Sequence, residues 1–198
     1  MAIVNSWLRS ARFALIAVAA LFLSAPAEAQ RPHTLTGNIR APQKFHSKIL
    51  NNDRDVIVYL PPDYDTSKTK RYSVFYMHDG QNLFDAATSF AGDWGLKSAL
   101  AWASRRGLEA IVVGIPNMGA ARIDEYTPFM DPKVGGGHGD RYLDYLINTV
   151  KPLVDERFRT LPDRAHTGIA GSSLGGLISL YAYFRHPAVF GFAAALSP

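Results

Sequence analysis

Residues 166–185 read HTGIAGSSLGGLISLYAYFR, which indicates a strand, a tight turn and a helix in succession. Residues 166–170 are predicted to form a strand, and residues 174–185 have the length of a helix that stops before Pro187. Between them, residues 171–175 form a G-x-S-x-G sequence. A serine on such a strand-to-helix turn lies at a helix N-terminus, where backbone N–H groups and the helix dipole favour developing negative charge. The stretch therefore predicts a nucleophilic serine.

The register of this motif identifies the serine. Ser173 has glycines two residues before it and two residues after it, whereas Ser172 has Ala170 and Leu174 at those places. Glycine is needed at both positions because a side chain there would clash between the strand and the helix. Ser173 is therefore the predicted nucleophile, and the backbone N–H of Leu174 is one predicted donor to the oxyanion. The alternative is a packing turn in which a small polar residue merely fits.

The sequence on either side alternates strand-like and helix-like segments. Further strands are predicted at residues 56–60, 72–77, 110–115 and 192–196, and a helix at 96–104. Another helix follows a candidate N-cap, Asp140, and Pro152 within its apolar stripe should kink or divide it. Strands that are apolar nearly throughout and alternate with helices indicate an α/β fold, with a mostly parallel sheet covered by helices on both faces.

A second oxyanion donor should come from the loop after an earlier central strand. Residues 76–82, YMHDGQN, leave such a strand and turn at Gly80. The backbone N–H of Gln81 is the predicted donor, with Asn82 as the alternative. We interpret His78 as a structural residue at the strand end, because the base in this architecture comes later in the chain.

Composition sets the broad class of protein. The chain has 198 residues, of which 47% are apolar, 12% aromatic and 19% charged, with a net charge of +4 and no cysteine. These values predict one soluble globular domain. The lack of cysteine excludes thiol nucleophiles, thiolate metal sites and iron–sulfur clusters. Basic residues are scattered among acidic ones instead of forming a stripe, which argues against nucleic acid as a partner.

Residues 1–29 have the pattern of a secretory signal peptide. Two arginines precede an uninterrupted apolar run at 13–23, and residues 27–29, AEA, supply small residues at the two positions that a signal peptidase reads. A membrane-spanning helix needs about 20 apolar residues, which favours a cleaved signal over the alternative, an N-terminal membrane anchor. We therefore expect an exported protein, periplasmic or secreted, whose mature domain is residues 30–198 and has no stable membrane span.

Several motifs occur in a fixed order along the chain. They are VYLPPDY at 58–64, YMHDGQNLFD at 76–85, Arg122 with EYTP at 125–128, AGSSLGG at 170–176, FG at 190–191 and LSP at 196–198. Together they resemble the esterase family of α/β-hydrolases, which includes enterochelin, feruloyl and acetyl-xylan esterases, S-formylglutathione hydrolases and mycolyltransferases. The resemblance implies the three-layer α/β-hydrolase sandwich and an ester hydrolase with a Ser-Asp/Glu-His triad, without cofactor or metal.

The residues that would activate Ser173 are missing from this sequence. In α/β-hydrolases an Asp or Glu and then a His follow the serine, yet no acidic residue follows Ser173 and the one later histidine is His186. We interpret His186 as a helix-terminal residue, about 18 Å along its helix. We expect an incomplete domain that lacks its last strands and helices and is inactive alone, with triad acid and histidine beyond residue 198. The alternatives are a catalytically inactive binding protein and an upstream histidine, His78 or His138.

Other expectations concern the chain end and the substrate. Residues 192–196 would form an apolar sheet edge without a following helix, so residues ending at Pro198 should aggregate when expressed alone. Export and the HDGQNLFD motif suggest a carbohydrate-linked, phenolic or siderophore ester. Phe84 and Trp94 either contact the substrate or pack in the core. Three residues of a later loop either line the cleft or form a loop salt bridge: Arg122, Glu125 and Tyr126.

Overall fold

The structure, a computed structural model, describes residues 31–90 and 92–198. The chain divides into two compact units, Met1–Pro32 and His33–Pro198. Only the last two residues of the first unit are described, and the architecture that follows is that of the second unit. The predicted signal peptide, residues 1–29, lies outside the described residues. Within the part of the chain that is described, no helix is both long enough and apolar enough to cross a membrane.

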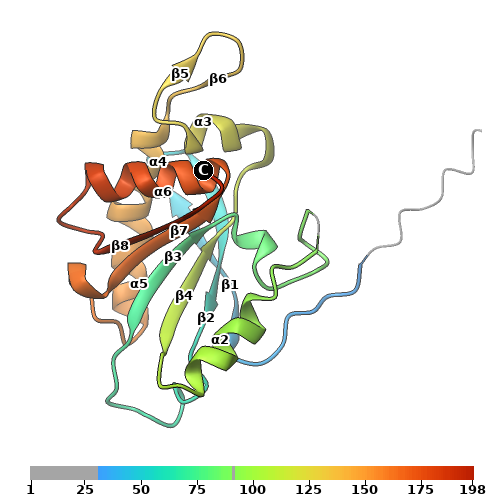
Figure 1. The fold of residues 1–198 in the computed structure, drawn as a ribbon, viewed down its shortest axis with the longest axis vertical. Coiled ribbons are helices and arrows are strands. Elements are labelled where there is room, and N and C mark those ends of the chain that lie inside the picture. The colour runs from blue at the N-terminus through green and yellow to red at the C-terminus, as the bar shows by residue number, and fades with distance from the viewer. Residues whose placement is uncertain (1–30, 91) are drawn as a thin grey trace, which may run out of the picture. The chain divides into compact units, whose positions relative to one another are not determined.

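A six-stranded sheet forms the centre of the second unit, with the strand order β1-β2-β4-β3-β7-β8 (Figure 1). Its strands are β1 (Ile39–Ser47), β2 (Asn52–Tyr59), β3 (Ser73–His78), β4 (Ala110–Ile115), β7 (Thr167–Ser172) and β8 (Phe192–Leu196). Strands β4, β3, β7 and β8 are parallel, whereas β2 is antiparallel to both β1 and β4. The mostly parallel sheet is therefore confirmed, and β1 is a strand that the apolar patterns did not indicate.

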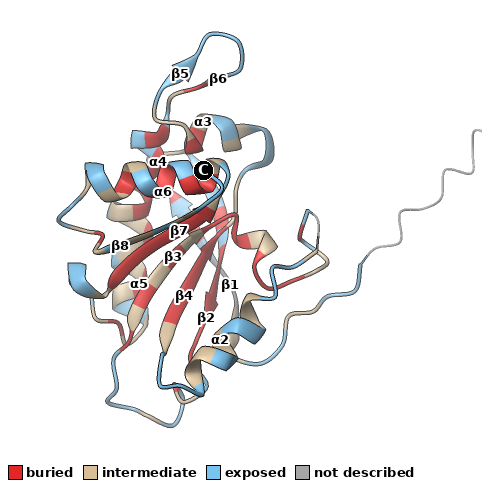
Figure 2. Ribbon diagram, viewed as in Figure 1, coloured by how far each residue is buried: buried red, intermediate tan, exposed pale blue. Residues whose placement is uncertain are grey.

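Alternate side chains of the central strands face two apolar layers. In β4, Ile111 and Val113 belong to one buried cluster and Val112 belongs to the other. The first cluster includes residues of α4 (Gly139–Tyr145), α5 (Lys151–Arg157) and α6 (Leu174–Arg185), and α2 (Leu96–Ser104) packs against the second. Helices thus cover both faces of the sheet, which confirms the three-layer arrangement (Figure 1). Figure 2 shows buried residues concentrated along β2, β4, β3 and β7.

The helix expected after Asp140 is divided ahead of Pro152, as the sequence predicts. Helix α4 gives way to a π-helical stretch at Leu146–Val150, and α5 follows with Pro152 in its first turn. Proline has no N–H to donate and its ring clashes with the carbonyl four residues earlier, so regular α-helical bonding is interrupted there. The predicted N-cap is wrong, because the helix begins after His138. Asp140 instead lies in the first turn, where its carboxylate accepts a hydrogen bond from Tyr181 (3.0 Å).

A short helix and a short hairpin, neither of them indicated by the sequence, follow β4. The helix is α3 (Arg122–Tyr126), and the hairpin pairs β5 (Met130–Asp131) with β6 (Gly135–Gly136). Gly136 and Gly137 have φ angles of 95° and 93°, a conformation that glycine adopts readily and other residues rarely do. Figure 1 shows α3 and the hairpin near the end of the sheet where β8 finishes. This is the carboxyl end of the parallel strands, which is where ligands bind in open α/β sheets.

Candidate active site

The serine turn, residues 171–175, joins β7 directly to α6. Ser173 is exposed and stands immediately before the helix, with φ 56° and ψ −128°. Few residues other than glycine adopt a positive φ, and such strain persists only where surrounding contacts enforce it. The Ser173 N–H donates to the carbonyl of Leu196 in β8 (2.9 Å), and the Ser173 carbonyl accepts from the N–H of Leu177 (3.0 Å). The neighbouring strand and the new helix therefore hold the serine in this conformation.

The two glycines of the motif are required by close packing. A Cβ on Gly171 would lie 2.6 Å from the backbone carbonyl carbon of Gly175, a distance that real Cβ atoms essentially never show. A Cβ on Gly175 would lie 3.2 Å from the Cβ of His78, which belongs to the neighbouring strand β3. The structure thus gives the motif the steric role that the sequence assigns to it. It also places the first turn of α6 directly against the end of β3.

A second turn, Gly80–Asn82, follows β3 and carries Gln81. Strands β3 and β7 are parallel neighbours, with Met77 opposite Ala170, so the two turns leave adjacent strand ends. The Asn82 N–H donates to the carbonyl of Asp79 (2.9 Å) and closes the turn. The N–H of Gln81 lies one residue before the N–H of Asn82. The first N–H groups of a helical turn have no acceptor within the turn, so the Gln81 N–H can donate to a group outside it. The Gln81 side chain is fixed through its Oε1 atom, which accepts from the N–H of Asn117 (3.1 Å).

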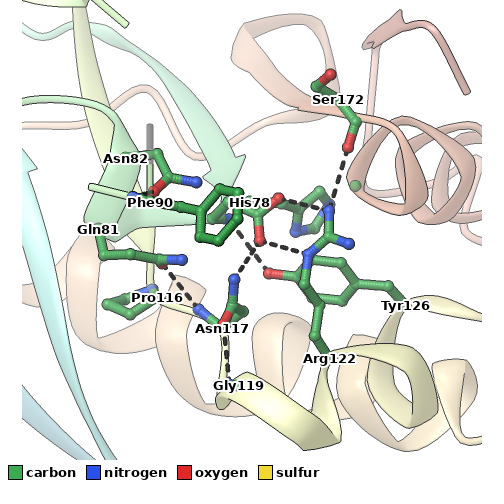
Figure 3. Close-up of polar contacts among 12 residues, drawn as sticks. His78, Gln81, Asn82, Phe90, Pro116, Asn117, Gly119, Arg122, Tyr126 and Ser172 are labelled. Carbon is green, nitrogen blue, oxygen red and sulfur yellow. Dashed lines mark hydrogen bonds and ion pairs between the residues drawn. The ribbon is translucent and has the colours of Figure 1, made fainter. Parts of the chain in front are cut away.

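Asp79 lies between these two turns and was missed by the sequence reasoning. It is 3% exposed and adopts a left-handed backbone conformation with φ 55°. Its carboxylate accepts hydrogen bonds from Arg122 Nε (2.8 Å), Arg122 Nη2 (2.9 Å) and Asn117 Nδ2 (2.6 Å). Figure 3 shows dashed lines running to one carboxylate from Arg122, at the start of α3, and from Asn117, in the segment after β4. The one sequence signal for Asp79 is its place between a buried strand and Gly80, at the carboxyl end of β3.

His78 is a structural residue at the end of β3, as the sequence reasoning proposes. Its imidazole is fully buried, with Nδ1 at 2.8 Å from the hydroxyl of Tyr142, and its ring lies against those of Tyr126 and Tyr142 (5.1 and 5.5 Å between centroids). Burial lowers the pKa of His78 to about 3. The side chain is therefore neutral at physiological pH and enclosed by aromatic rings.

Two other histidines flank helices, His186 after α6 and His138 before α4. His186 follows the last residue of α6, and its N–H donates to the carbonyl of Ala182 (2.8 Å). Ser173 precedes the first residue of the same twelve-residue helix, so the two residues are separated by about 18 Å of helix. His138 precedes α4, and its Nδ1 lies 4.0 Å from a carboxylate oxygen of Asp124.

Ion pairs account for the charged residues of α3. Glu125 pairs with Arg54 in the buried interior, and Arg122 pairs with Asp79. The hydroxyl of Tyr126 accepts a hydrogen bond from the backbone N–H of Asp79 (3.2 Å). Salt bridges therefore account for Arg122 and Glu125, whereas Tyr126 makes a hydrogen bond, and the Arg122 pair reaches the strand end next to the serine turn.

Aromatic residues after the second turn differ in exposure. Phe84 is 2% exposed and stacks on Tyr59 with 6.0 Å between ring centroids, so it belongs to the core. Trp94 is 40% exposed. Phe90, which the sequence reasoning did not single out, is 91% exposed, and its backbone N–H donates to Asn82 Oδ1 (3.0 Å). Within residues 31–90 and 92–198, no group of three or more His, Asp or Glu side chains has an arrangement that could hold a metal ion.

The strand order, the two helical layers and the strained serine between β7 and α6 define an α/β-hydrolase. A model of the family described as "Putative esterase" matches residues 47–198. The chain therefore belongs to this esterase family. It is 32% identical over 151 residues to the uncharacterized protein YbbA of Bacillus subtilis, covering 73% of this chain and 56% of that protein.

Two further relatives carry descriptions of function. The chain is 33% identical over 161 residues to the siderophore triacetylfusarinine C esterase of Aspergillus fumigatus, covering 75% of this chain and 53% of that protein. Among solved structures, it is similar to an IroE-like serine hydrolase from Shewanella oneidensis, with a TM-score of 0.65, 24% identity and coverage of 78% of this chain and 49% of that one. The chain thus spans about half the length of the relatives it matches.

Proposed function

We propose that the full-length protein is a serine ester hydrolase with Ser173 as its nucleophile. One observation carries this proposal: Ser173 is exposed at the start of α6 in a strained conformation, with φ 56°, that the neighbouring strand and helix enforce. A packing turn has no need of an exposed hydroxyl or of this strain. Strained backbone conformations are concentrated at functional sites, where the surrounding structure maintains them.

The proposed reaction is acyl transfer in two steps. The hydroxyl oxygen of Ser173 attacks the ester carbonyl while a histidine takes its proton, and the resulting oxyanion accepts hydrogen bonds from the N–H groups of Leu174 and Gln81. The histidine returns the proton to the leaving alcohol, which leaves an acyl-serine. Water then attacks the acyl-serine ester while the same histidine takes its proton, and the carboxylic acid is released as Ser173 regains its proton. Both proposed donors are backbone groups at the starts of helical turns, so they need no side-chain reorganisation.

The base and its acid are proposed to come from sequence beyond residue 198. No Asp or Glu follows Ser173 in this chain, and His186 lies at the far end of α6. His78 is buried and neutral, which argues against the alternative of an upstream histidine in that position. The relatives are about twice as long as the matched region, which is consistent with triad residues in their remaining length.

The proposed substrate is a carbohydrate-linked, phenolic or siderophore ester. One relative is described as a siderophore esterase, and another, from Xylanibacter ruminicola and 27% identical, is described as an endo-1,4-beta-xylanase/feruloyl esterase. Phe90, which extends from the loop tied to Asn82, offers an exposed aromatic surface beside the second turn. We also propose that the protein is exported by a signal peptide at residues 1–29, on the pattern of their sequence.

Substitution of the serine tests the proposal. In the full-length protein, we expect Ser173→Ala to lower the kcat for p-nitrophenyl acetate by about 10⁴-fold or more, because the nucleophile is lost and only the oxyanion donors and binding remain. A fluorophosphonate probe should label wild type and leave Ser173→Ala unlabelled. Ser98→Ala, at an exposed serine of α2, is the matched control and should keep wild-type rate and labelling.

Two results would contradict this assignment. Unchanged hydrolysis in Ser173→Ala would show that another residue is the nucleophile. A folded full-length wild type that neither hydrolyses esters nor reacts with the probe would favour the alternative, a catalytically inactive binding protein on the same scaffold. Rates with a feruloyl ester, an acetylated xylan and a siderophore ester then rank the three proposed substrate classes.

A further inference from the structure

The buried carboxylate of Asp79 connects the second turn to the serine turn. Its backbone carbonyl accepts the hydrogen bond from Asn82 that closes the second turn, which carries Gln81. Its Oδ2 atom lies 3.4 Å from the place that a Cβ on Gly175 would occupy, so the carboxylate lies against the first turn of α6. The position of Asp79 therefore affects both turns at once.

Arg122 extends this connection to the peptide group that precedes the nucleophile. Two atoms of its guanidinium group donate to the Asp79 carboxylate, and one of them, Nη2, also lies 3.4 Å from the carbonyl oxygen of Ser172 (Figure 3). That carbonyl belongs to the peptide group whose N–H, on Ser173, donates to Leu196 (2.9 Å). Both ends of this peptide group are thus held, which restricts rotation of the backbone at Ser173.

The pair also balances charge next to the place where an oxyanion would form. An unpaired carboxylate near the N–H groups of Gln81 and Leu174 would repel the developing negative charge. The bidentate pairing with Arg122 offsets the charge of the Asp79 carboxylate, and the bond to Asp79 raises the pKa of Arg122, so the guanidinium group stays charged. Arg122 is 27% exposed at its side chain, whereas that of Asp79 is 4% exposed. A carboxylate as buried as that of Asp79 requires a cationic partner such as Arg122.

We propose that the Asp79–Arg122 pair is a positioning device that sets the second turn and the Ser172–Ser173 peptide group in the geometry needed to bind the oxyanion. The inference rests on the proposed function for its catalytic consequence. Its structural consequence, order in two segments that are far apart in sequence, is independent of any activity. Asn117 supports the device, because its side chain donates to Asp79 and its N–H holds Gln81.

The experiment uses Arg122→Gln, Arg122→Lys and a control in the full-length protein. Amide hydrogen exchange is measured over residues 79–84 and 171–176, and kcat and KM are measured with p-nitrophenyl acetate. The control is Arg40→Gln, which removes another bidentate arginine–aspartate pair, with Asp65 (2.7 and 2.8 Å), on the exposed surface. It separates the loss of any such pair from the loss of this one.

We expect Arg122→Gln to speed exchange in both segments and to lower kcat by about 10- to 100-fold with little change in KM, because a small misplacement of reacting groups affects the rate more than binding. Arg122→Lys keeps the positive charge but cannot reproduce the two parallel bonds and reach Ser172, so it should fall between wild type and Arg122→Gln. Arg40→Gln should match wild type in all three measurements.

The two proposals fail in different ways. Exchange that stays at the wild-type rate in both segments of Arg122→Gln would overturn the positioning proposal, whether or not the protein hydrolyses esters. A rise in KM with an unchanged kcat would also overturn it, because that result indicates a role in substrate binding. Faster exchange in a protein whose wild type has no hydrolase activity would support the positioning of the two turns and overturn the proposed function alone.

Discussion

At the scale of single residues, burial next to the serine turn fixes the charge of His78. Its imidazole is fully buried and contacts the hydroxyl of Tyr142. Burial is the main cause of the lowered pKa, which Asp79 opposes and Arg122 reinforces. The folded protein binds a proton there only near pH 3, whereas the unfolded chain binds one near pH 6.5, the ordinary value. Unfolding between these two pH values therefore takes up a proton, so stability falls as the pH falls.

This difference predicts an acid-sensitive stability. Between pH 7 and pH 5, we expect His78 alone to lower the free energy of unfolding of the full-length protein by about 2 kcal/mol. Urea unfolding at the two pH values measures the change. His78→Gln cannot titrate and should lose this part of the pH dependence, whereas His138→Gln, at a largely exposed histidine, should retain it. The same pH dependence in His78→Gln and wild type would contradict a buried neutral imidazole.

The residues of the site differ in how far the sequence reveals them. Ser173 could be located because its glycines stand two residues away on each side and form a local pattern. Asp79 could not, because its partners Asn117 and Arg122 follow 38 and 43 residues later, and only the fold brings them together. A buried carboxylate requires partners, but the sequence does not show that Asp79 is buried. The turn that carries Gln81 was predictable from Gly80 and the end of the preceding strand.

At the scale of elements, the close approach of the turn after β3 to β4 depends on one glycine, Gly80. A Cβ on Gly80 would lie 2.6 Å from the backbone nitrogen of Ile115 and would also overlap the backbone carbon of Gly114. Neither of these atoms can move without shifting β4. The φ of Gly80 is not positive, so a substitution there tests this contact without the strain of a left-handed backbone.

We therefore expect Gly80→Ala to destabilise the full-length protein by about 1–3 kcal/mol, the usual cost of overpacking, and to displace the turn that carries Gln81. Gly114→Ala is the matched comparison: its Cβ would meet the end of the Leu83 side chain at 3.0 Å and the Cα of Gly80 at 3.2 Å. These distances are longer than the 2.4–2.7 Å backbone contacts of a Cβ on Gly80, so the effect should be smaller. Chemical denaturation gives both values. Equal stability of Gly80→Ala and wild type would show that the turn can move away from β4 without penalty.

The sequence predicted helices and strands correctly where a segment is apolar. It did not predict strands that form only because they pair with another segment. The sequence ranges 96–104, 110–115, 174–185 and 192–196 agree with α2, β4, α6 and β8. Strand β1 lies at a sheet edge and lacks a continuous apolar run, so it is defined by antiparallel pairing with β2. The hairpin of β5 and β6 has two residues in each strand, Met-Asp and Gly-Gly, which carry no strand periodicity.

At the scale of the whole sheet, the strand order explains the location of the candidate site. The chain runs from β3 to β4 on one side and then returns to β7 on the other side of β3. This reversal makes the carboxyl end of β3 a switch point, where loops diverge and leave space for a ligand. Apolar runs alone do not specify such an order, because any of the parallel strands could be adjacent. The motif resemblance implied the α/β-hydrolase fold, whereas the strand order itself is seen in the structure.

Arg54 links several layers around this switch point. It comes from β2, is 2% exposed and pairs with Glu125 of α3, which is 5% exposed. Its Nη1 atom donates to the carbonyl of Pro116 after β4 (3.2 Å), and its guanidinium group lies 5.6 and 5.3 Å from the ring centroids of Tyr142 and Tyr145. This buried pair therefore joins the antiparallel side of the sheet to α3 and α4. The charges of Arg54 and Glu125 are removed from water, so each is stabilised in the interior only as long as the other is present.

The pair predicts a non-additive response to substitution in the full-length protein. Glu125→Leu leaves the charge of Arg54 buried without its partner, so we expect a loss of about 3–5 kcal/mol in the free energy of unfolding. Arg54→Met combined with Glu125→Leu removes both charges, and urea unfolding should show the double variant to be more stable than Glu125→Leu alone. Breaking the exposed Arg40–Asp65 pair should cost about 1 kcal/mol or less. A double variant no more stable than Glu125→Leu would contradict this expectation. It would show that the packing and hydrogen bonds of Arg54 stabilise the protein more than its unpaired charge destabilises it, so that the link between β2 and α3 does not depend on ion pairing.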